Sequence, residues 1–333
     1  MRLEGKHLVI IGGSSGIGLE TARLALTEGA SVTIAGRSEE RLRRAAETLG
    51  RAAIAGPPAA RFRTARADVT DESSIRALFE GEPRVDHLFL PAGELRPGDG
   101  DVLTADPGGL RSVLESRVLG AAYAVREARP RMAGGSITLM SGLYSTRPGR
   151  GGAFGAAAVA AVEGLTRALA LDLAPTRVNA VAPGLIDTAL WDTFGPQRAA
   201  ILALGAALPV GRVGRPEEVA EGVLFLMCNG FVTGAVLSID GGGSLVRRTR
   251  SSVRKAFVIV LFFLPMICGW VVLYKLSAYR RDGRGFGATF LNRNLRAYRR
   301  DFYTDEGQDL LRWAWFLAII TIPWCLGVGL LLG

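Results

Sequence analysis

The sequence predicts an α/β fold in which helices cover both faces of a doubly wound parallel sheet. Short apolar runs of strand length alternate with longer segments of helical periodicity over residues 1–246. A glycine-rich turn joins the first apolar run to the first helical segment, and no solenoid-type repeat is present. Strands alternating with helices imply parallel β-α-β units with right-handed crossovers, so we expect one parallel sheet.

Each element is assigned from the hydrophobic pattern, in chain order. Apolar runs predict strands at residues 7–11, 31–35, 61–65 (the weakest), 85–90, 136–140, 177–181 and 235–239. Helical patterns predict helices at residues 16–28, 39–49, 73–79, 109–128, 154–173 and 216–227. These elements occupy residues 1–246, a length sufficient for one large α/β domain with its own core.

The charge of the chain is concentrated near its end. Lys and Arg number 40 against 31 Asp and Glu, a formal net charge of +9. Residues 1–246 hold 26 basic and 26 acidic side chains, so residues 247–333 hold the remaining 14 and 5. A neutral domain lacks the localised cationic surface that nucleic acid requires, so no nucleic-acid partner is expected. Three Cys and two His argue against a disulfide-stapled module, and no metal site is expected.

The last part of the chain has the pattern of a membrane tail. A basic linker, residues 247–255, precedes an uncharged run of 19 residues, 256–274. A basic connector, 275–312, leads to a second uncharged run of 21 residues, 313–333. Because about 20 helical residues cross the hydrocarbon core of a bilayer, the two runs predict a helical membrane hairpin and lipid as a partner. A pair of buried core helices is the alternative.

The orientation of this hairpin stays open. The basic linker favours a cytoplasmic main domain on a membrane-associated protein, and the N-terminus has no signal-peptide pattern. The connector, however, carries nine positive and five negative groups, which conflicts with two full crossings. A hairpin dipping into one leaflet, or an inverted topology, removes the conflict. The connector itself is interpreted either as an interfacial amphipathic helix or as a solvated loop.

The glycine-rich turn is typical of a dinucleotide site. The first predicted strand is followed by Gly12-Gly13-Ser14-Ser15-Gly16-Ile17-Gly18. Glycines there allow a tight turn and a close approach to a pyrophosphate, whose charge is met by amides of the next helix. The same letters match Gly-x-Ser-x-Gly, with Ser14 as a hydrolase nucleophile. That alternative is rejected because His7 and His87 fall at the opposite ends of their strands.

Motifs in the same order along residues 5–246 resemble those of the short-chain dehydrogenase/reductase family, which implies a Rossmann-like fold and a nicotinamide cofactor. Ile11 replaces the usual Thr before the loop, and Pro91 replaces the Asn of an Asn-Ala-Gly motif. Asp240-Gly241-Gly242 resembles the end of the family's domain. The resemblance and the loop pattern together assign cofactor binding to Gly12, Ser14, Ser15, Gly16, Ile17, Gly18, Arg37, Asp68, Val69, Ala92, Gly93, Pro183, Gly184, Ile186 and Thr188.

The end of the second predicted strand favours NADP(H) over NAD(H). It runs Ile34-Ala35-Gly36-Arg37-Ser38 and contains no carboxylate to accept hydrogen bonds from a ribose 2′-hydroxyl. Arg37 instead suits a 2′-phosphate. The alternative is a solvated arginine at the start of a charged helix.

The positions that carry catalysis in the family are substituted here. Members use a Tyr acid/base, a Lys four residues later, a Ser on the fifth strand and an Asn in the fourth helix. The match of residues 163–170 to the family places the Tyr at Gly155 and the Lys at Val159, and the usual spacing of thirteen residues places the Ser at Gly142. Alignment of the fourth helix on Gly120 places the Asn at Arg117. The chain has three lysines, of which only Lys6 lies in the domain, so no Tyr-x-x-x-Lys pair exists.

Other groups are candidates for the missing acid/base. Ser141 and Tyr144 flank the end of the fifth strand, and Arg117 or Arg147 could assist them electrostatically. Alternatively, Tyr144 packs in its loop and Ser141 forms a hydrogen bond with the backbone. Three hypotheses stay open: an unusual NADP(H)-dependent oxidoreductase, an inactive cofactor-binding regulatory module, or a scaffold. The small residues of 155–161 suit helix packing in a homo-oligomer, and an apolar lid at 186–209 suits either a small apolar substrate or core cover.

Overall fold

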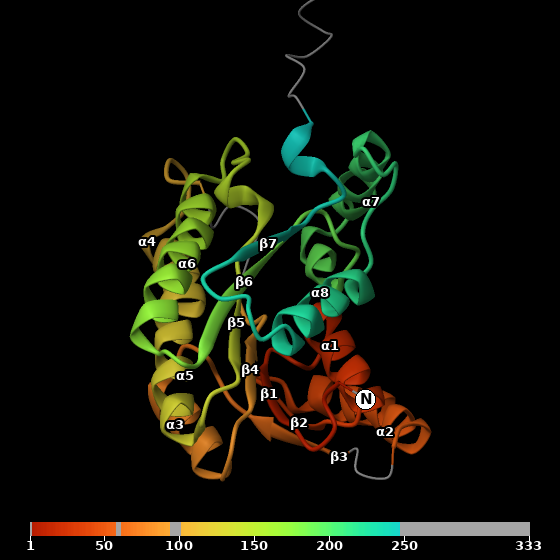
Figure 1. Cartoon of the computed structure of the whole chain (residues 1–333). Helices are drawn as coiled ribbons and strands as arrows, with labels where there is room; N and C mark the ends of the chain where they lie inside the picture. Colours follow the sequence, from red (N-terminus) through yellow and green to blue (C-terminus); the bar gives the residue numbers. More distant parts are fainter. Residues whose placement is uncertain (1, 58–60, 94–100, 247–333) are drawn as a thin grey trace, which may run out of the picture. The chain divides into compact units, whose positions relative to one another are not determined.

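A computed structural model describes residues 2–57, 61–93 and 101–246 of the chain (Figure 1). The chain divides into two compact units, Met1–Val246 and Arg247–Gly333, and only the first is described. The predicted linker, both uncharged runs and the connector between them therefore lie outside the described residues.

The domain is built on one sheet of seven parallel strands in the order β3-β2-β1-β4-β5-β6-β7 (Figure 1). The strands are β1 His7–Ile11, β2 Ser31–Gly36, β3 Arg61–Arg66, β4 His87–Leu90, β5 Ser136–Met140, β6 Arg177–Pro183 and β7 Val236–Ile239. The order reverses after β3, where the chain crosses from one side of β1 to the other. A ligand crevice at the carboxyl ends of β1 and β4 is the general consequence of such a reversal.

Helices cover both faces of this sheet, as predicted. The main helices are α1 Gly16–Thr27, α2 Glu39–Ala55, α3 Glu72–Glu80, α4 Pro107–Leu114, α5 Gly120–Ala128, α6 Ala153–Asp172, α7 Gln197–Ala203 and α8 Pro216–Cys228. Leu8 and Ile10 of β1 pack in the core beneath α1, α2 and α8. Val9 and Ile11 belong to a second core on the side of α3, α5 and α6. Alternate residues of one strand thus serve two cores, which is why the strands are almost continuously apolar.

The helix predicted at 109–128 is present, but it begins at Pro107 and contains a π-helical stretch. The segment predicted at 109–128 consists of α4, a π-helical stretch Glu115–Leu119 and α5. A Cβ on Gly120 would lie 2.5 Å from Cγ2 of Val69, so the chain approaches the loop after β3 very closely at this point. The other elements match the predictions to within a few residues, except that α2 runs to Ala55 and that the lid contains α7.

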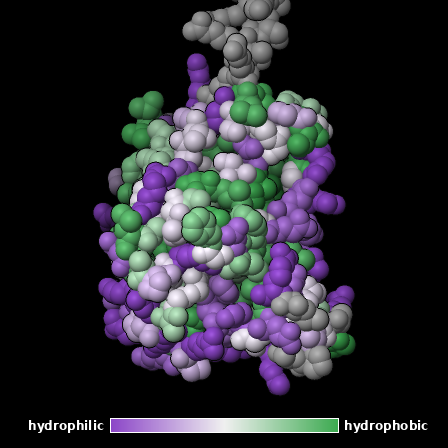
Figure 2. Space-filling model, in the orientation of Figure 1, coloured by the Kyte–Doolittle hydropathy of each residue, from purple (hydrophilic) through white to green (hydrophobic). Residues whose placement is uncertain are grey.

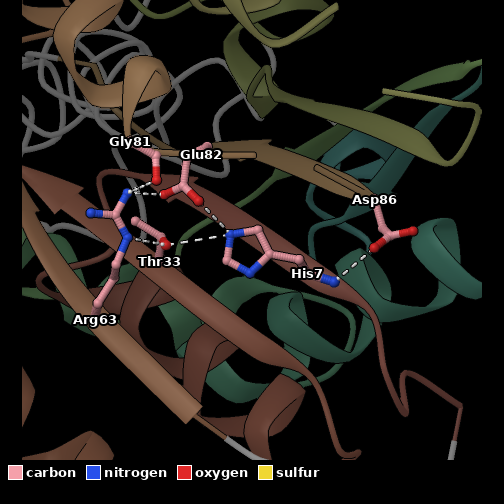
Figure 3. Close-up of polar contacts among 6 residues, drawn as sticks. All are labelled: His7, Thr33, Arg63, Gly81, Glu82 and Asp86. Carbon is pink, nitrogen blue, oxygen red and sulfur yellow. Dashed lines mark hydrogen bonds and ion pairs between the residues drawn. The ribbon is translucent and has the colours of Figure 1, made fainter. Parts of the chain in front are cut away.

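A polar cluster lies in the amino-terminal half of the sheet, away from the glycine-rich turn (Figure 3). His7 Nε2 lies 2.7 Å from Oε2 of Glu82, and Arg63 forms an ion pair with the other oxygen of that carboxylate. Arg63 also donates to Thr33 Oγ1 at 3.1 Å. Burial opposes ionisation of Glu82, but hydrogen bonds from His7, Thr33 and Arg63 outweigh it and hold the Glu82 pKa below its usual value. This Glu82 cluster ties β1, β2 and β3 to the segment before β4.

Among the described residues, one helix is long and apolar enough to cross a membrane, by length and composition alone. It is α6. Its Ala158, Val159, Val162 and Thr166 are buried, and it packs against β5 and β6.

Candidate functional site

The glycine-rich loop between β1 and α1 is shaped by contacts that exclude side chains. Gly12 has a φ of +101°, and a Cβ on it would lie 2.7 Å from the amide nitrogen of Ala92. A Cβ on Gly18 would lie 2.2 Å from the carbonyl oxygen of Gly12. The loop therefore folds tightly onto the first turn of α1, with Ser15 at the N-cap position. Free amides at such a turn form an anion site.

The loops after β4 and β6 close on this turn. Ala92 donates its N–H to the carbonyl of Ile11 at 3.1 Å, which extends the pairing of β4 with β1. A Cβ on Gly16 would lie 3.3 Å from Cγ2 of Thr188, so the loop after β6 reaches the start of α1. Gly184 is held against the end of β7, where its Cβ would lie 2.7 Å from Cα of Asp240. The structure thus brings the predicted residues from three strands to one edge of the sheet.

The residues predicted for the adenosine end lie at the carboxyl ends of β2 and β3. Arg37 directly follows β2 and is exposed, and Ser38 caps α2 by accepting the N–H of Arg41 at 3.3 Å. Ser14 approaches the same point, because a Cβ on Gly36 would lie 3.2 Å from its Oγ. Asp68 Oδ1 accepts two hydrogen bonds from Thr70, at 2.9 and 2.8 Å.

Of the four positions predicted for the family's catalytic residues, Gly142, Gly155 and Val159 carry no acid or base. A Cβ on Gly142 would lie 3.9 Å from Cγ1 of Val159 and 4.0 Å from the carbonyl oxygen of Pro183. A Cβ on Gly155 would meet nothing within 4 Å. A Cβ at either glycine thus meets no close contact, but neither residue offers the hydroxyl of a serine or the phenol of a tyrosine.

Arg117 is the charged exception among these four positions. It lies in the π-helical stretch between α4 and α5, a distortion common at functional sites. Its side chain is in contact with Gly93, where a Cβ would lie 3.0 Å from Cζ and 3.2 Å from Nη1. Burial lowers the pKa of Arg117. Sequence reasoning placed Arg117 at the Asn position but did not find its contact with Gly93.

The two candidate replacements are placed differently by the structure. Ser141 is buried and donates its hydroxyl to Oε1 of Glu163 at 2.8 Å, with the carbonyl of Val159 at 3.3 Å. Its hydroxyl is therefore directed to α6. Tyr144 is 47% exposed in a short 3₁₀ turn, and its hydroxyl would lie 2.9 Å from a Cβ on Gly149. Its ring is thus in contact with the loop that leads to α6.

The segment that ends the domain lies beside the same loop. Arg147 donates from Nη1 to the carbonyl of Ser244 at 3.4 Å, and a Cβ on Gly243 would lie 3.1 Å from Cδ2 of Leu143. No sequence signal relates residues so far apart along the chain. The point at which the chain leaves the described domain is therefore close to Tyr144.

The lid after β6 has a mixed surface. Trp191 donates Nε1–H to the carbonyl of Ile186 at 2.7 Å, and its ring lies 5.5 Å from that of Phe194. Figure 2 shows apolar surface mainly in the half of the molecule that holds α7, whereas the opposite end is mostly hydrophilic. Leu204, Val210 and Leu245 are among the exposed large apolar residues.

The hydrolase alternative fails on geometry. His7 and His87 are the first residues of β1 and β4, whereas Ser14 follows the end of β1. His87 is buried and in hydrogen-bond contact with Ser136, 2.8 Å from its Oγ. Neither imidazole lies at the edge of the sheet that carries Ser14.

Comparison with known proteins agrees with this geometry. The family model described as enoyl-(acyl carrier protein) reductase matches residues 12–244. A short-chain dehydrogenase/reductase of Stachybotrys chlorohalonatus is 34% identical over 259 residues, which cover 73% of this chain and 98% of that protein. A 3-oxoacyl-[acyl-carrier-protein] reductase of Thermotoga maritima is 35% identical over 253 residues, covering 73% and 99%.

Solved structures give the same result. The MalC reductase/Diels-Alderase of Malbranchea aurantiaca aligns with a TM-score of 0.68 at 30% identity, covering 74% of this chain and 98% of that one. A small-chain dehydrogenase in complex with NADPH aligns with a TM-score of 0.60 at 31% identity, covering 72% and 99%. With its seven-stranded parallel sheet, its glycine-rich turn and these relatives, the chain belongs to the short-chain dehydrogenase/reductase family.

Proposed function

We propose that the chain is an NADP(H)-binding member of this family whose active site is non-standard, and that its tail holds it at a membrane. The observation that carries the proposal is the contrast between two parts of one site. The glycine turn is retained with contacts that exclude side chains at Gly12 and Gly18. The four positions that carry catalysis in the family instead hold Arg117, Gly142, Gly155 and Val159.

The described residues suit a nicotinamide dinucleotide. The turn at residues 12–18 would hold the pyrophosphate, and Thr188 would close over it from the loop after β6. Arg37 would pair with a 2′-phosphate. The end of β2, residues 34–38, has no carboxylate that would repel this phosphate. When bound, such a cofactor supplies a hydride donor or acceptor. The relative solved with NADPH supports this choice by analogy.

Tyr144 is the group in this site best suited to donate a proton. It is exposed, in contrast to Ser141, whose hydroxyl is bonded to Glu163. No lysine of the domain lies near it, because Lys6 precedes β1. General acid/base assistance is typically worth about 10²–10⁴-fold, so turnover is expected to be slow.

The alternative is a cofactor-binding regulatory or scaffold protein without turnover. The open space at Gly155 and the apolar side chain at Val159 favour it, because neither position offers a titratable group. In this case nucleotide occupancy, rather than a product, is the output of the domain.

The membrane and oligomer parts of the proposal come from separate features. The uncharged runs at 256–274 and 313–333 support a bilayer anchor, with the main domain on the cytoplasmic side. A protein held at a membrane would meet small, apolar substrates. The small, exposed residues of α6 suit packing against a second copy.

The test begins with calorimetric titration of the full chain, in detergent micelles, with NADPH and with NADH. Tight NADPH binding is expected, with NADH at least about tenfold weaker. Consumption of NADPH is then followed with small aldehydes, ketones and enones, for wild type and Tyr144→Phe. Turnover that is lost in Tyr144→Phe supports the oxidoreductase, and binding without turnover supports the regulatory alternative. Absence of NADPH binding contradicts both.

A further inference from the structure

Arg117 is a cation without a counter-charge in the part of the chain that the structure describes. No ion pair or hydrogen bond joins it to another described residue, and its pKa is lowered by burial without an opposing contribution from an acid. Its guanidinium lies against Gly93, within 3.0 to 3.2 Å of the position a Cβ would take. By contrast, Arg84, Arg198 and Arg212 pair with carboxylates at 2.5 to 2.6 Å.

Such an arrangement is costly unless an anion completes it. Arg117 is half-buried, and a guanidinium stays charged under all ordinary conditions, so it cannot relieve this partial burial by losing a proton. Withdrawing a charge from water is unfavourable unless the charge is paired and hydrogen-bonded. Arginine presents parallel N–H donors that match the two oxygens of a carboxylate.

The position of Arg117 identifies where that anion would lie. Gly93 follows β4, at the carboxyl edge of the sheet, and the π-helical stretch of Arg117 packs against α6. Gly142 and Gly155 lie near the start of α6. A Cβ on Gly142 would have no atom closer than 3.9 Å, and one on Gly155 would have none within 4 Å. The apolar residues of the lid, including Trp191 and Phe194, follow β6 at this edge. A cation at the same edge of the sheet as these glycines and an apolar lid suits an acid with an apolar body.

We infer that Arg117 binds the carboxylate of an apolar organic acid, which makes such acids the ligand class of this site. The inference rests on the proposed function in that it names the ligand of the same site. The retained cofactor turn and the Arg117 position are separate features, so each can fail alone. No covalent step is involved, since Arg117 contributes charge and two hydrogen bonds.

The experiment measures thermal unfolding of the full chain in micelles, saturated with NADP⁺, at constant ionic strength. Benzoate is the probe, and benzamide is the neutral molecule of the same shape. Benzoate is expected to raise Tm with half-saturation in the millimolar range, while benzamide and chloride leave it unchanged. Inorganic phosphate forms a second arm, and a phosphate response larger than that to benzoate overturns the carboxylate assignment.

Three variants relate the response to Arg117. Arg117→Gln is expected to weaken the benzoate response at least about tenfold, and Arg117→Lys to weaken it less. Arg111→Gln is the matched control, because Arg111 is exposed in α4, shortly before the π-helical stretch. It is expected to respond like wild type. Equal responses of wild type and Arg117→Gln overturn the inference, as does a wild type that does not distinguish benzoate from benzamide.

Folding and cofactor binding are checked in the same samples. Circular dichroism and NADPH titration show whether Arg117→Gln folds and keeps its nucleotide site. A benzoate response in a protein that binds no NADPH contradicts the proposed function and leaves the Arg117 inference standing. NADPH binding without a benzoate response contradicts the Arg117 inference and leaves the proposed function standing.

Discussion

A Cβ on Gly142 would lie 3.9 Å from Cγ1 of Val159, an ordinary van der Waals distance. The family resemblance predicts that these two residues occupy the positions of the family's serine and lysine. The backbone of β5 and α6 thus brings the two positions together although neither side chain has a polar group. We therefore expect that the backbone framework of the family's active site is kept while its reacting groups are replaced.

Restoring the four groups is expected to create activity. The variant Arg117→Asn, Gly142→Ser, Gly155→Tyr and Val159→Lys replaces each position by the family's residue. The open surroundings of Gly142 and Gly155 accommodate the added side chains. NADPH-dependent reduction of aldehydes or ketones is expected to rise at least about 10²-fold, the usual contribution of general acid/base catalysis.

The control replaces tyrosine by phenylalanine in the same background, Gly155→Phe. It has nearly the same bulk but no phenol, so its turnover is expected to stay at the wild-type level. Val159 is 6% exposed, and a lysine there is expected to lower Tm. A folded, NADPH-binding quadruple variant with no gain would show that the retained backbone is not a working framework.

The fold was largely predictable because its signals are local. The apolar run of His7–Ile11, followed by Gly12, marks a strand and a tight turn in a few consecutive residues. The π-helical stretch inside the helix predicted at 109–128 was not predictable. It accompanies the contact of Gly120 with Val69, which belongs to a loop some fifty residues earlier. The hydrophobic pattern of the sequence continues through the π-helical stretch and does not reveal it.

The site was predictable to a smaller degree, for the same physical reason. Motif spacing predicted which residues bind the cofactor and which positions lack the family's catalytic groups, and both stay predictions. The partner of Ser141, Glu163, lies two helical turns into α6, and only the packing of α6 on β5 brings them together. The contact between Arg117 and Gly93 likewise depends on tertiary structure. Sequence reasoning therefore identified positions, whereas side-chain directions required the fold.

Arg37 is expected to control the choice between the two nicotinamide cofactors. Removing its charge with Arg37→Gln takes away a charge-assisted hydrogen bond worth about 1.5–3 kcal/mol. NADPH binding is therefore expected to weaken roughly 10- to 100-fold, while NADH binding changes little. Titration calorimetry with both nucleotides measures the ratio. Arg51→Gln, at the far end of α2, is the control, and equal losses for NADPH and NADH would refute the assignment.

Gly18 and Gly50 are expected to respond in opposite directions to alanine. Both lie in helices, but a Cβ on Gly18 would lie 2.2 Å from the carbonyl oxygen of Gly12, whereas one on Gly50 meets nothing within 4 Å. Gly18→Ala is expected to cost about 1–3 kcal/mol and to weaken NADPH binding. Gly50→Ala is expected to stabilise by roughly 0.5–1 kcal/mol. Thermal unfolding with and without NADPH compares them, and a stable, tightly binding Gly18→Ala would contradict the geometry.

His87 is expected to make the domain less stable in mild acid. Burial lowers its pKa from 6.5 to about 4. Between these values the unfolded chain binds a proton that the folded domain does not, so stability falls as pH falls from 6.5 to about 4. The loss is on the order of 3 kcal/mol over this window. Urea unfolding of residues 1–246, the part that matches whole relatives, measures it. In His87→Asn the decline over this window is expected to become shallower.

The Glu82 cluster is expected to change the stability of the domain at a lower pH than His87 does. The pKa of Glu82 is lowered in the folded state, because hydrogen bonds from His7, Thr33 and Arg63 outweigh the opposing effect of burial. The stability it contributes is therefore present above the unfolded value of about 4.5 and is lost as pH falls through the lower folded value. Glu82→Gln removes this titration.

At neutral pH Glu82→Gln is expected to cost about 2 kcal/mol, because Arg63 loses its ion pair while remaining partly exposed. The difference from wild type is expected to shrink as pH falls through the lowered pKa of Glu82, below which wild-type Glu82 is itself protonated. Urea unfolding between pH 3 and 7 tests both statements. Glu80→Gln, an exposed carboxylate at the end of α3, is the control and should follow wild type throughout. A constant difference between wild type and Glu82→Gln across this range would mean that the carboxylate charge does not stabilise the cluster.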